Sequence, residues 1–423
     1  MDKQRYDRYL QILKDELVPA TGCTEPIALA YAAALGRSLL GKTPESVRAS
    51  ISGSIIKNVK SVVVPGTNGM KGIETAIAAG ILVGRAEAKL EVLAQAPDDT
   101  AERIRAYLAT EPVEILLSNT SCIFDIDLTL RAGADEAEVR ITGHHTNVVL
   151  LRLNQEIKLC RELPDDDDTS RSVTALNIQE ILTFVRELSP EDVAPVLERQ
   201  IACNTALSDA GLNEAWGAQI GRTLLERSDA PDTLTRAKAR AAAGSDARMS
   251  GCELPAVINS GSGNQGMTVT LPVVTWAEEL HASHEELLRA LALANLVAIR
   301  IKQTIGCLSA YCGAVCAGCA AGAGVAYLYG GDQSLIEHTV VNGLAILSGT
   351  ICDGAKPSCA AKIAMSVEAG ILGLQMARKG LEFVHGEGIV KKGIENTIEE
   401  VGVLGRDGMA HTNDVILGIM LAK

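Results

Sequence analysis

The stretch AEVRITGHHTNVVLLRLN, residues 137–154, decides the fold class, because it predicts a β-hairpin in the first half of the chain. Two strand-like runs, VEILL and FDIDLTL, precede it. Helical patterns come earlier still, at residues 1–17, 26–40 and 73–83. The chain up to about residue 165 therefore predicts a mixed α/β region with antiparallel strands near its end.

The sequence changes character after the acidic run LPDDDD, Leu163–Asp168, which is the best candidate for a linker. A solvated loop inside one domain is the alternative. Ala-rich helical patterns dominate from Ile178 to Leu421, and only PAVINSGSGNQGMTVTLPVV, residues 255–274, interrupts them with a glycine-rich loop. We therefore predict an α+β protein, with an α/β domain over 1–168 and a mostly all-α domain over 169–423.

Composition excludes several classes of function. The 423 residues carry a formal net charge of −13, which argues against nucleic acid, because binding there depends on neutralising phosphates. Charges interrupt the first helix pattern, unlike a signal peptide. Eleven cysteines without an export signal indicate a reducing cytoplasm. The uncharged run Gln303–Gly331 is rich in Ala, Gly and Cys, so we expect a buried core helix there and no membrane span.

The spacing C-x3-C-x2-C of Cys312, Cys316 and Cys319 is that of radical enzymes that use S-adenosylmethionine and an iron–sulfur cluster. Those enzymes carry it on a loop after the first strand of a barrel, usually with an aromatic residue before the last cysteine. Here the run is helix-forming, and Gly318 takes that place. Small core residues on one helix face explain two of the three cysteines, which disfavours the radical alternative.

Cys352 and Cys359 flank Gly354 and Pro357 in TICDGAKPSCA, residues 350–360, a loop that can turn both sulfurs inward. A catalytic [4Fe–4S] cluster needs only three thiolates and leaves one iron open for substrate. The helix holding Cys312 is the natural source of a third thiolate. Two alternatives stay open: buried small residues and a closed zinc site.

Cys23 precedes a predicted helix in VPATGCTEPIALAYAAA, residues 18–34. Thr24 and Glu25 suit the N-cap, and Pro26 suits the first turn. A thiol just before a helix N-terminus should have a lowered pKa, which makes it a usable base or nucleophile. A thiol packed under the turn is the alternative.

Two glycine-rich turns, PGTNGMKG at Pro65–Gly72 and NSGSGNQGM at Asn259–Met267, can hold a carboxylate with backbone N–H groups, although such sequences are often only tight turns. Lys57 and Lys71 are candidate charge partners. The Lys of SGSIIKN, together with SGSGNQG as a candidate phosphate-binding turn, also suggests pyridoxal phosphate as a cofactor. The helical second half of the chain matches poorly the α/β sheets of lyases that use this cofactor.

The histidines of HHTN lie at the hairpin tip, where we expect solvent exposure. The substrate-binding candidates of the sequence are Thr24, Glu25, Lys57, Asn68, Lys71, His145, Ser260, Ser262, Asn264 and Gln265.

Five longer segments carry a resemblance: PATGCTEPIALA, KNVKSVVVPGTNGMKG, INSGSGNQGM, SAYCGAVCAG and GTICDGAKPSCAAK. Together they resemble the L-cysteine desulfidase family, whose bacterial members were long described only as an uncharacterised family. That family is related to the iron–sulfur L-serine dehydratases. The resemblance runs from about residue 15 to residue 420.

The resemblance implies an α/β domain with a functional cysteine at Cys23 and an all-α domain with an oxygen-sensitive [4Fe–4S] cluster. The family's cluster cysteines match Cys312, Cys352 and Cys359, which leaves Cys316 and Cys319 as bystanders. In the serine dehydratases the segment around Cys23 carries Ser and His, so this sequence resembles the desulfidases more. Some serine dehydratases end in a cysteine that occupies the open iron, whereas this chain ends in GIMLAK.

We therefore expect a lyase, independent of pyridoxal phosphate, that eliminates sulfide from L-cysteine and gives hydrogen sulfide, ammonia and pyruvate. The cluster would act as Lewis acid, and Cys23 as the base that removes the α-proton. L-serine dehydration by the same groups is one alternative, and a non-catalytic cluster protein that senses iron or redox state is another. We expect a cytoplasmic protein with no nucleic-acid or membrane partner, and a homodimer as the candidate assembly.

Overall fold

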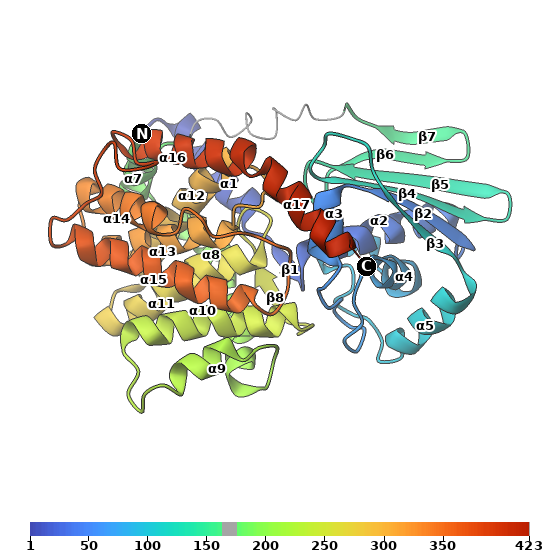
Figure 1. Ribbon diagram of the computed structural model, residues 1–423, viewed down its shortest axis with the longest axis horizontal. Helices are drawn as coiled ribbons and strands as arrows, with labels where there is room; N and C mark the ends of the chain where they lie inside the picture. Colours follow the sequence, from blue (N-terminus) through green and yellow to red (C-terminus); the bar gives the residue numbers. More distant parts are fainter. Residues whose placement is uncertain (163–175, 423) are drawn as a thin grey trace.

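The computed structural model describes residues 1–162 and 176–422 and separates the sheet from most of the long helices (Figure 1). The first part holds α1 (Lys3–Glu16), β1 (Pro19–Thr21), α2 (Thr24–Leu40), β2 (Ser46–Ile51), α3 (Gly53–Val59), α4 (Ile73–Val83), η1 (Ala86–Glu91), α5 (Thr100–Thr110), β3 (Val113–Leu117), β4 (Asp125–Ala132), β5 (Asp135–Thr142), β6 (Val148–Leu153) and β7 (Glu156–Cys160). The second part holds α7 (Ile178–Glu187), α8 (Pro190–Asn213), α9 (Ile220–Leu225), α10 (Thr233–Met249), β8 (Pro255–Val257), α11 (Gly263–Leu280), α12 (His284–Ile305), α13 (Gly313–Leu328), α14 (Gln333–Ile346), α15 (Cys359–Ala377), α16 (Ile394–Val403), η2 (Leu404–Gly408) and α17 (Ala410–Leu421). The predicted α+β class is confirmed.

The first part of the chain contains a six-stranded sheet with the strand order β3-β2-β4-β5-β6-β7. β2 and β3 run parallel, and the other neighbouring strands run antiparallel. β5 and β6 form the hairpin predicted from residues 137–154. Buried residues alternate along β4, as expected for a sheet with one covered face, and α2 packs on that face.

α13 lies in the core of the helical part and contacts α11, α12, α14 and α15. It contains much of the uncharged run expected to be a core helix, and residues 314–326 are all buried. Gly318 and Gly370 bring the backbones of α13 and α15 together, because a Cβ on Gly370 would lie 2.0 Å from the Gly318 carbonyl oxygen. Small side chains therefore set the spacing of these two helices.

We expect Gly370→Ala to destabilise the protein by about 3 kcal/mol or more, because the added methyl must push the two backbones apart. Gly418→Ala is the matched control, since it also lies inside a helix but nothing is within 4 Å of its added Cβ. That change should stabilise α17 by about 0.5–1 kcal/mol. Urea unfolding followed by circular dichroism measures both. Equal effects of the two substitutions would contradict the tight crossing.

α15 is the one helix within the described ranges that is long and apolar enough to cross a membrane, and this is weak evidence. In its most apolar window 56% of the residues are buried inside the protein. The helix packs against α10, α13 and α14. These contacts are those of a core helix.

The interruption expected at residues 255–274 is shorter than predicted. It consists of β8 and a turn that ends at Ser262, which caps α11 by accepting a hydrogen bond from the Gln265 N–H. The Thr268 and Thr270 hydroxyls donate to carbonyls four residues earlier, so this β-branched run stays helical. The Asn259–Met267 segment is therefore part turn and part first helical turn.

Elements from each part of the chain pack against the other part where the two meet. α1 packs against α8 in the helical part, β1 pairs with β8, and α17 leaves the helical part to pack on α3 (Figure 1). The linker predicted at Leu163–Asp168 lies outside the described residues, so the division at residue 168 stays a prediction.

Candidate functional site

The start of α2 holds a buried carboxylate surrounded by hydrogen-bond donors. Cys23 Sγ donates to Glu25 Oε2 at 3.0 Å, and the Thr24 hydroxyl is 3.2 Å from the same oxygen. Asn58 Nδ2 donates to Glu25 Oε1 at 3.0 Å. Cys23 is the N-cap residue, which corrects the assignment of that position to Thr24 or Glu25. Its side chain makes no capping bond because it turns toward Glu25.

The predicted lowering of the Cys23 pKa is wrong. Burial raises the pKa of the thiol well above its ordinary value, and the Glu25 carboxylate adds to the rise, while Arg248 opposes it. Burial also works to raise the pKa of Glu25, but the His145 ring and the hydrogen bonds from Cys23 and Asn58 hold it below its usual range. The proton therefore rests on the sulfur. Desolvation and a neighbouring anion outweigh the helix N-terminus here.

The expectation that His145 is solvent-exposed is also wrong. It lies in the turn between β5 and β6, but its ring packs edge-on against Phe124, with the ring centroids 4.8 Å apart. Its Nε2 is buried and has no hydrogen-bond partner in the described part of the chain. Gly261 lies against it, since an added Cβ would be 2.9 Å from His145 Cε1. Burial lowers the pKa of His145 to about 4, against the opposing effect of Glu25.

The pKa of His145 predicts a loss of stability in mild acid. Its folded-state pKa lies below the value near 6.5 of an unfolded chain, so the unfolded state binds more protons between the two values. The contribution of His145 to the free energy of unfolding is fully present above pH 6.5. It is lost as the pH drops toward 4, which lowers stability by roughly 3 kcal/mol.

The measurement is the free energy of unfolding at pH 7 and at pH 4.5, for the wild type and for His145→Gln. The variant should lose less stability than the wild type over this interval. His385→Gln, at an exposed position, should behave as the wild type does. Parallel pH dependences of the wild type and His145→Gln would contradict the assignment.

Arg248, at the end of α10, is a buried cation that the sequence interpretation did not include. Its residue is 2% exposed, and its Nη1 donates to Asn264 Oδ1 at 3.1 Å. Nε and Nη2 have no hydrogen-bond partner in the part of the chain that the structure describes. Its charge acts on Cys23 and His145. An arginine in an Ala-rich helix carries no sequence signal of such a position.

The three cysteines predicted to hold a cluster come from two neighbouring loops. Tyr311 and Ile351 form an isolated antiparallel bridge, which places Cys312 and Cys352 on adjoining backbone. Burial raises the pKa of the Cys312 thiol to about 12, and the nearby Cys352 and Cys359 thiols add to the rise. Cys359 opens α15 and shares one small apolar cluster with Cys23. All four thiols therefore lie in one region between the two parts of the chain.

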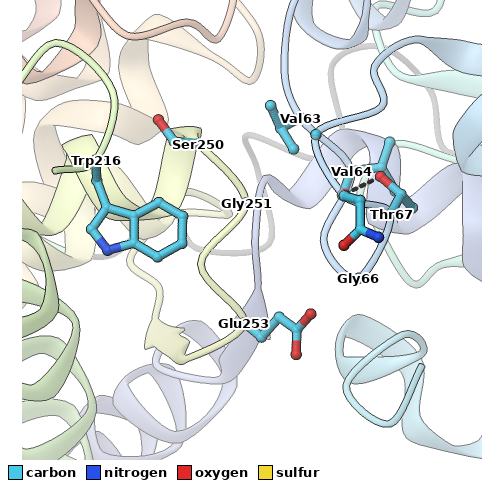
Figure 2. A pocket seen from close by; sticks show the side chains of 10 residues that line it. Val63, Val64, Gly66, Thr67, Trp216, Ser250, Gly251 and Glu253 are labelled. Atoms are coloured by element: carbon cyan, nitrogen blue, oxygen red, sulfur yellow. Dashed lines mark hydrogen bonds between the residues drawn. The ribbon is translucent and has the colours of Figure 1, made fainter. Parts of the chain in front are cut away.

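A pocket of about 380 Å³ lies beside this region (Figure 2). Trp216 and Ser250 lie on one wall, and the turn with Val64 and Thr67 lies on the other. The pocket walls continue into the site, because Val62 and Met249, the chain neighbours of Val63 and Ser250, pack on Cys23. The pocket is thus a candidate entry to the site.

Comparison with known proteins matches the chain to one family model, and to several relatives over nearly its full length. The family model described as "Serine dehydratase alpha chain" matches residues 87–418. The chain is 50% identical to the UPF0597 protein of Desulfitobacterium hafniense, over 98% of this chain and 97% of the relative. It is 46% identical to the UPF0597 protein of Lachnoclostridium phytofermentans, over 98% of this chain and all of the relative.

The chain belongs to the serine dehydratase alpha chain family. Membership supports a lyase of the dehydratase type, in a family that is generally dependent on iron–sulfur clusters. The predicted relation to the iron–sulfur serine dehydratases is confirmed, and the choice of cysteine as substrate is a separate question.

Cys312, Cys352 and Cys359 lie near one another, because the pKa of the Cys312 thiol is raised by the other two. Within residues 1–162 and 176–422, no three His, Cys, Asp or Glu side chains are grouped closely enough to hold a single metal ion. This finding supports neither a closed zinc site nor a formed cluster site, since zinc needs sulfurs about 4 Å apart around one point. A [4Fe–4S] cluster instead spreads its thiolates over separate irons. The assignment of Cys312, Cys352 and Cys359 as cluster ligands therefore stays a prediction.

The remaining predicted residues divide into three groups. Ser260 and Ser262 belong to the turn that touches the site, where the Gly261 carbonyl accepts from the Thr24 hydroxyl at 2.8 Å. Lys57 supports the cysteine loop: its Nζ donates to Asn413 Oδ1 at 2.6 Å and to the Cys352 carbonyl at 3.3 Å. Lys71 is exposed away from these contacts, and Asn68 lines the pocket.

Two amides of the site have one oxygen without a partner among the described residues, namely Asn58 Oδ1 and Gln265 Oε1. Gln265 reaches the cysteine loops, because a Cβ on Gly313 would lie 2.7 Å from its amide. The sequence predicted Gln265 as a site residue but not Asn58. Asn58 follows Lys57 on α3, and only the fold shows that it faces Glu25.

Proposed function

We propose that this member of the serine dehydratase alpha chain family is an L-cysteine desulfidase. A [4Fe–4S] cluster held by Cys312, Cys352 and Cys359 would supply Lewis-acid chemistry at the substrate's leaving group. The observation that supports the proposal most is the apolar cluster shared by Cys23 and Cys359. It puts an acid–base group beside the cluster ligands.

The proton path of this proposal starts at the Cys23 thiol. Because Glu25 accepts a hydrogen bond from Cys23 Sγ, the carboxylate can take the thiol proton when substrate is bound. The thiolate then removes the α-proton, the Cβ–S bond breaks, and the proton on Glu25 passes to the leaving sulfide. The products are hydrogen sulfide and aminoacrylate, which hydrolyses in water to pyruvate and ammonia.

L-serine dehydration is the second candidate, and the family match favours it. The same residues would remove the α-proton, and water would leave in place of sulfide. A thiol at Cys23, where the matching segment of the serine dehydratases carries Ser and His, supports the cysteine substrate. All eleven cysteines are free thiols, which suits the proposed cytoplasmic location.

The test is purification without oxygen, followed by iron and acid-labile sulfide analysis and by assays of pyruvate release from L-cysteine and from L-serine. About four irons per chain and a higher kcat/KM for L-cysteine would support the proposal. Higher kcat/KM for L-serine would assign the dehydratase. A cluster without pyruvate from either amino acid would assign a sensor, and zinc in place of iron would overturn the cluster.

A further inference from the structure

We propose that Arg248 binds the α-carboxylate of the substrate, and that Glu25 and Asn58 receive its ammonium group. The site would then select a zwitterionic amino acid by its backbone groups. This inference deepens the proposed function and rests on it for the location of the reaction, but it concerns binding alone.

The first observation is the cost of keeping Arg248 where it is. A guanidinium that is 2% exposed loses its hydration, and among the described residues it forms no ion pair. Its one hydrogen bond there is to a neutral amide, Asn264. A buried charge without a counter-ion is strongly destabilising unless a ligand supplies one.

The second observation is which donors are left. Nε and Nη2 lie on the same edge of the guanidinium, and neither has a hydrogen-bond partner among the residues that the structure describes. Two parallel N–H groups on one edge match the two oxygens of a carboxylate. A Cβ on Gly263 would lie 2.4 Å from Nε, so this glycine leaves the edge uncovered. The geometry favours a planar carboxylate.

The third observation is the opposite polarity of the groups near the start of α2. The pKa of Glu25 lies below its usual range, and Glu25 Oε1 accepts a hydrogen bond from Asn58 Nδ2. Asn58 Oδ1 has no partner in the described part of the chain. Asn58 is 6% exposed. These acceptors suit an ammonium group. A ligand that satisfies both sides must carry a carboxylate and an ammonium together, as an α-amino acid does.

The experiment measures binding of L-alanine, which has no leaving group at Cβ, to the anaerobically purified holoprotein by titration calorimetry. L-alaninamide lacks the carboxylate charge, propionate lacks the ammonium, and inorganic phosphate tests a general anion site. We expect L-alanine to bind at least about tenfold more tightly than any of these three compounds. L-alaninamide and propionate each lack one charged group that would form a hydrogen bond, and phosphate lacks the shape of an amino acid.

Arg248→Met should weaken L-alanine binding by about 100-fold, since it removes one partner of a buried charge pair. It should leave the unfolding temperature of the free protein unchanged or higher, because an unpaired buried charge is replaced by an apolar chain. Gly263→Ala should weaken binding about tenfold by displacing the guanidinium while keeping its charge.

Arg240→Met is the matched control. Arg240 lies on the same helix, α10, but is bound to Thr275 and Glu278. This change should leave L-alanine binding unaltered. Unchanged L-alanine binding in Arg248→Met would overturn the inference, as would tighter binding of phosphate than of L-alanine. Normal L-alanine binding without turnover of L-cysteine or L-serine would instead leave the inference standing and reject the proposed function.

Discussion

Cys352→Ser is expected to remove the iron and the activity together, with iron falling from about four per chain to almost none. Serine is a poor ligand for iron. The proposed cluster has only three protein thiolates, and the two that remain in the variant are too few to hold it. The fold should survive, because Cys352 meets the rest of the protein through its backbone. Its N–H donates to the Ala310 carbonyl at 2.7 Å, and its own carbonyl accepts from Lys57.

Cys316→Ala is the matched control for Cys352→Ser. Cys316 is a fully buried cysteine in α13, four residues after Cys312, and we assign it no ligand role. Iron analysis, visible absorbance and pyruvate release measure both variants. Iron retained in Cys352→Ser, or iron lost in Cys316→Ala alone, would contradict the assignment of the ligands.

Cys23→Ala is expected to lower kcat/KM for L-cysteine by about 10²–10⁴-fold, the usual contribution of a positioned acid–base group. The iron content should stay near the wild-type value, because Cys23 is not one of the proposed ligands. Among the described residues the thiol makes one hydrogen bond, to Glu25, so its loss should change stability little. Activity at the wild-type level in Cys23→Ala would reject Cys23 as the base.

The Glu25→Gln variant tests the coupling between the two groups. If Glu25 accepts the thiol proton, this variant should lose kcat at saturating L-cysteine to a similar extent, and the kcat of the double variant should be no lower than that of either single one. Cys252→Ala is the control for a buried thiol elsewhere, since Cys252 is 6% exposed and lies in the helical core. It should keep full activity.

The sequence was informative where one local pattern controls the outcome. The hairpin at 137–154, the helix at 73–83 and the position of Cys23 before a helix follow from short-range periodicity and turn residues. The whole-segment resemblance selected the three loop cysteines, and the family match agrees with it at the level of the serine dehydratases.

Charges and burial were poorly predicted because they depend on how the chain packs around each residue. The pKa of Cys23 is raised by desolvation and by Glu25, whereas the helix terminus alone suggested the opposite direction. His145 lies in a turn, but its ring packs on Phe124 and lies against Gly261. Arg248 is informative because it lacks an acidic partner within residues 1–162 and 176–422, and a sequence pattern does not reveal a missing partner.

The contact between α17 and α3 has a consequence for how the protein is made. Lys57 is bonded to Asn413, 356 residues later, and Lys60 donates to the Met420 carbonyl. The support of the Cys352 loop is therefore complete only after residue 413 has been made and α17 has docked on α3. For the proposed cluster, a tag fused after α17 should lower iron loading more than a tag fused before α1.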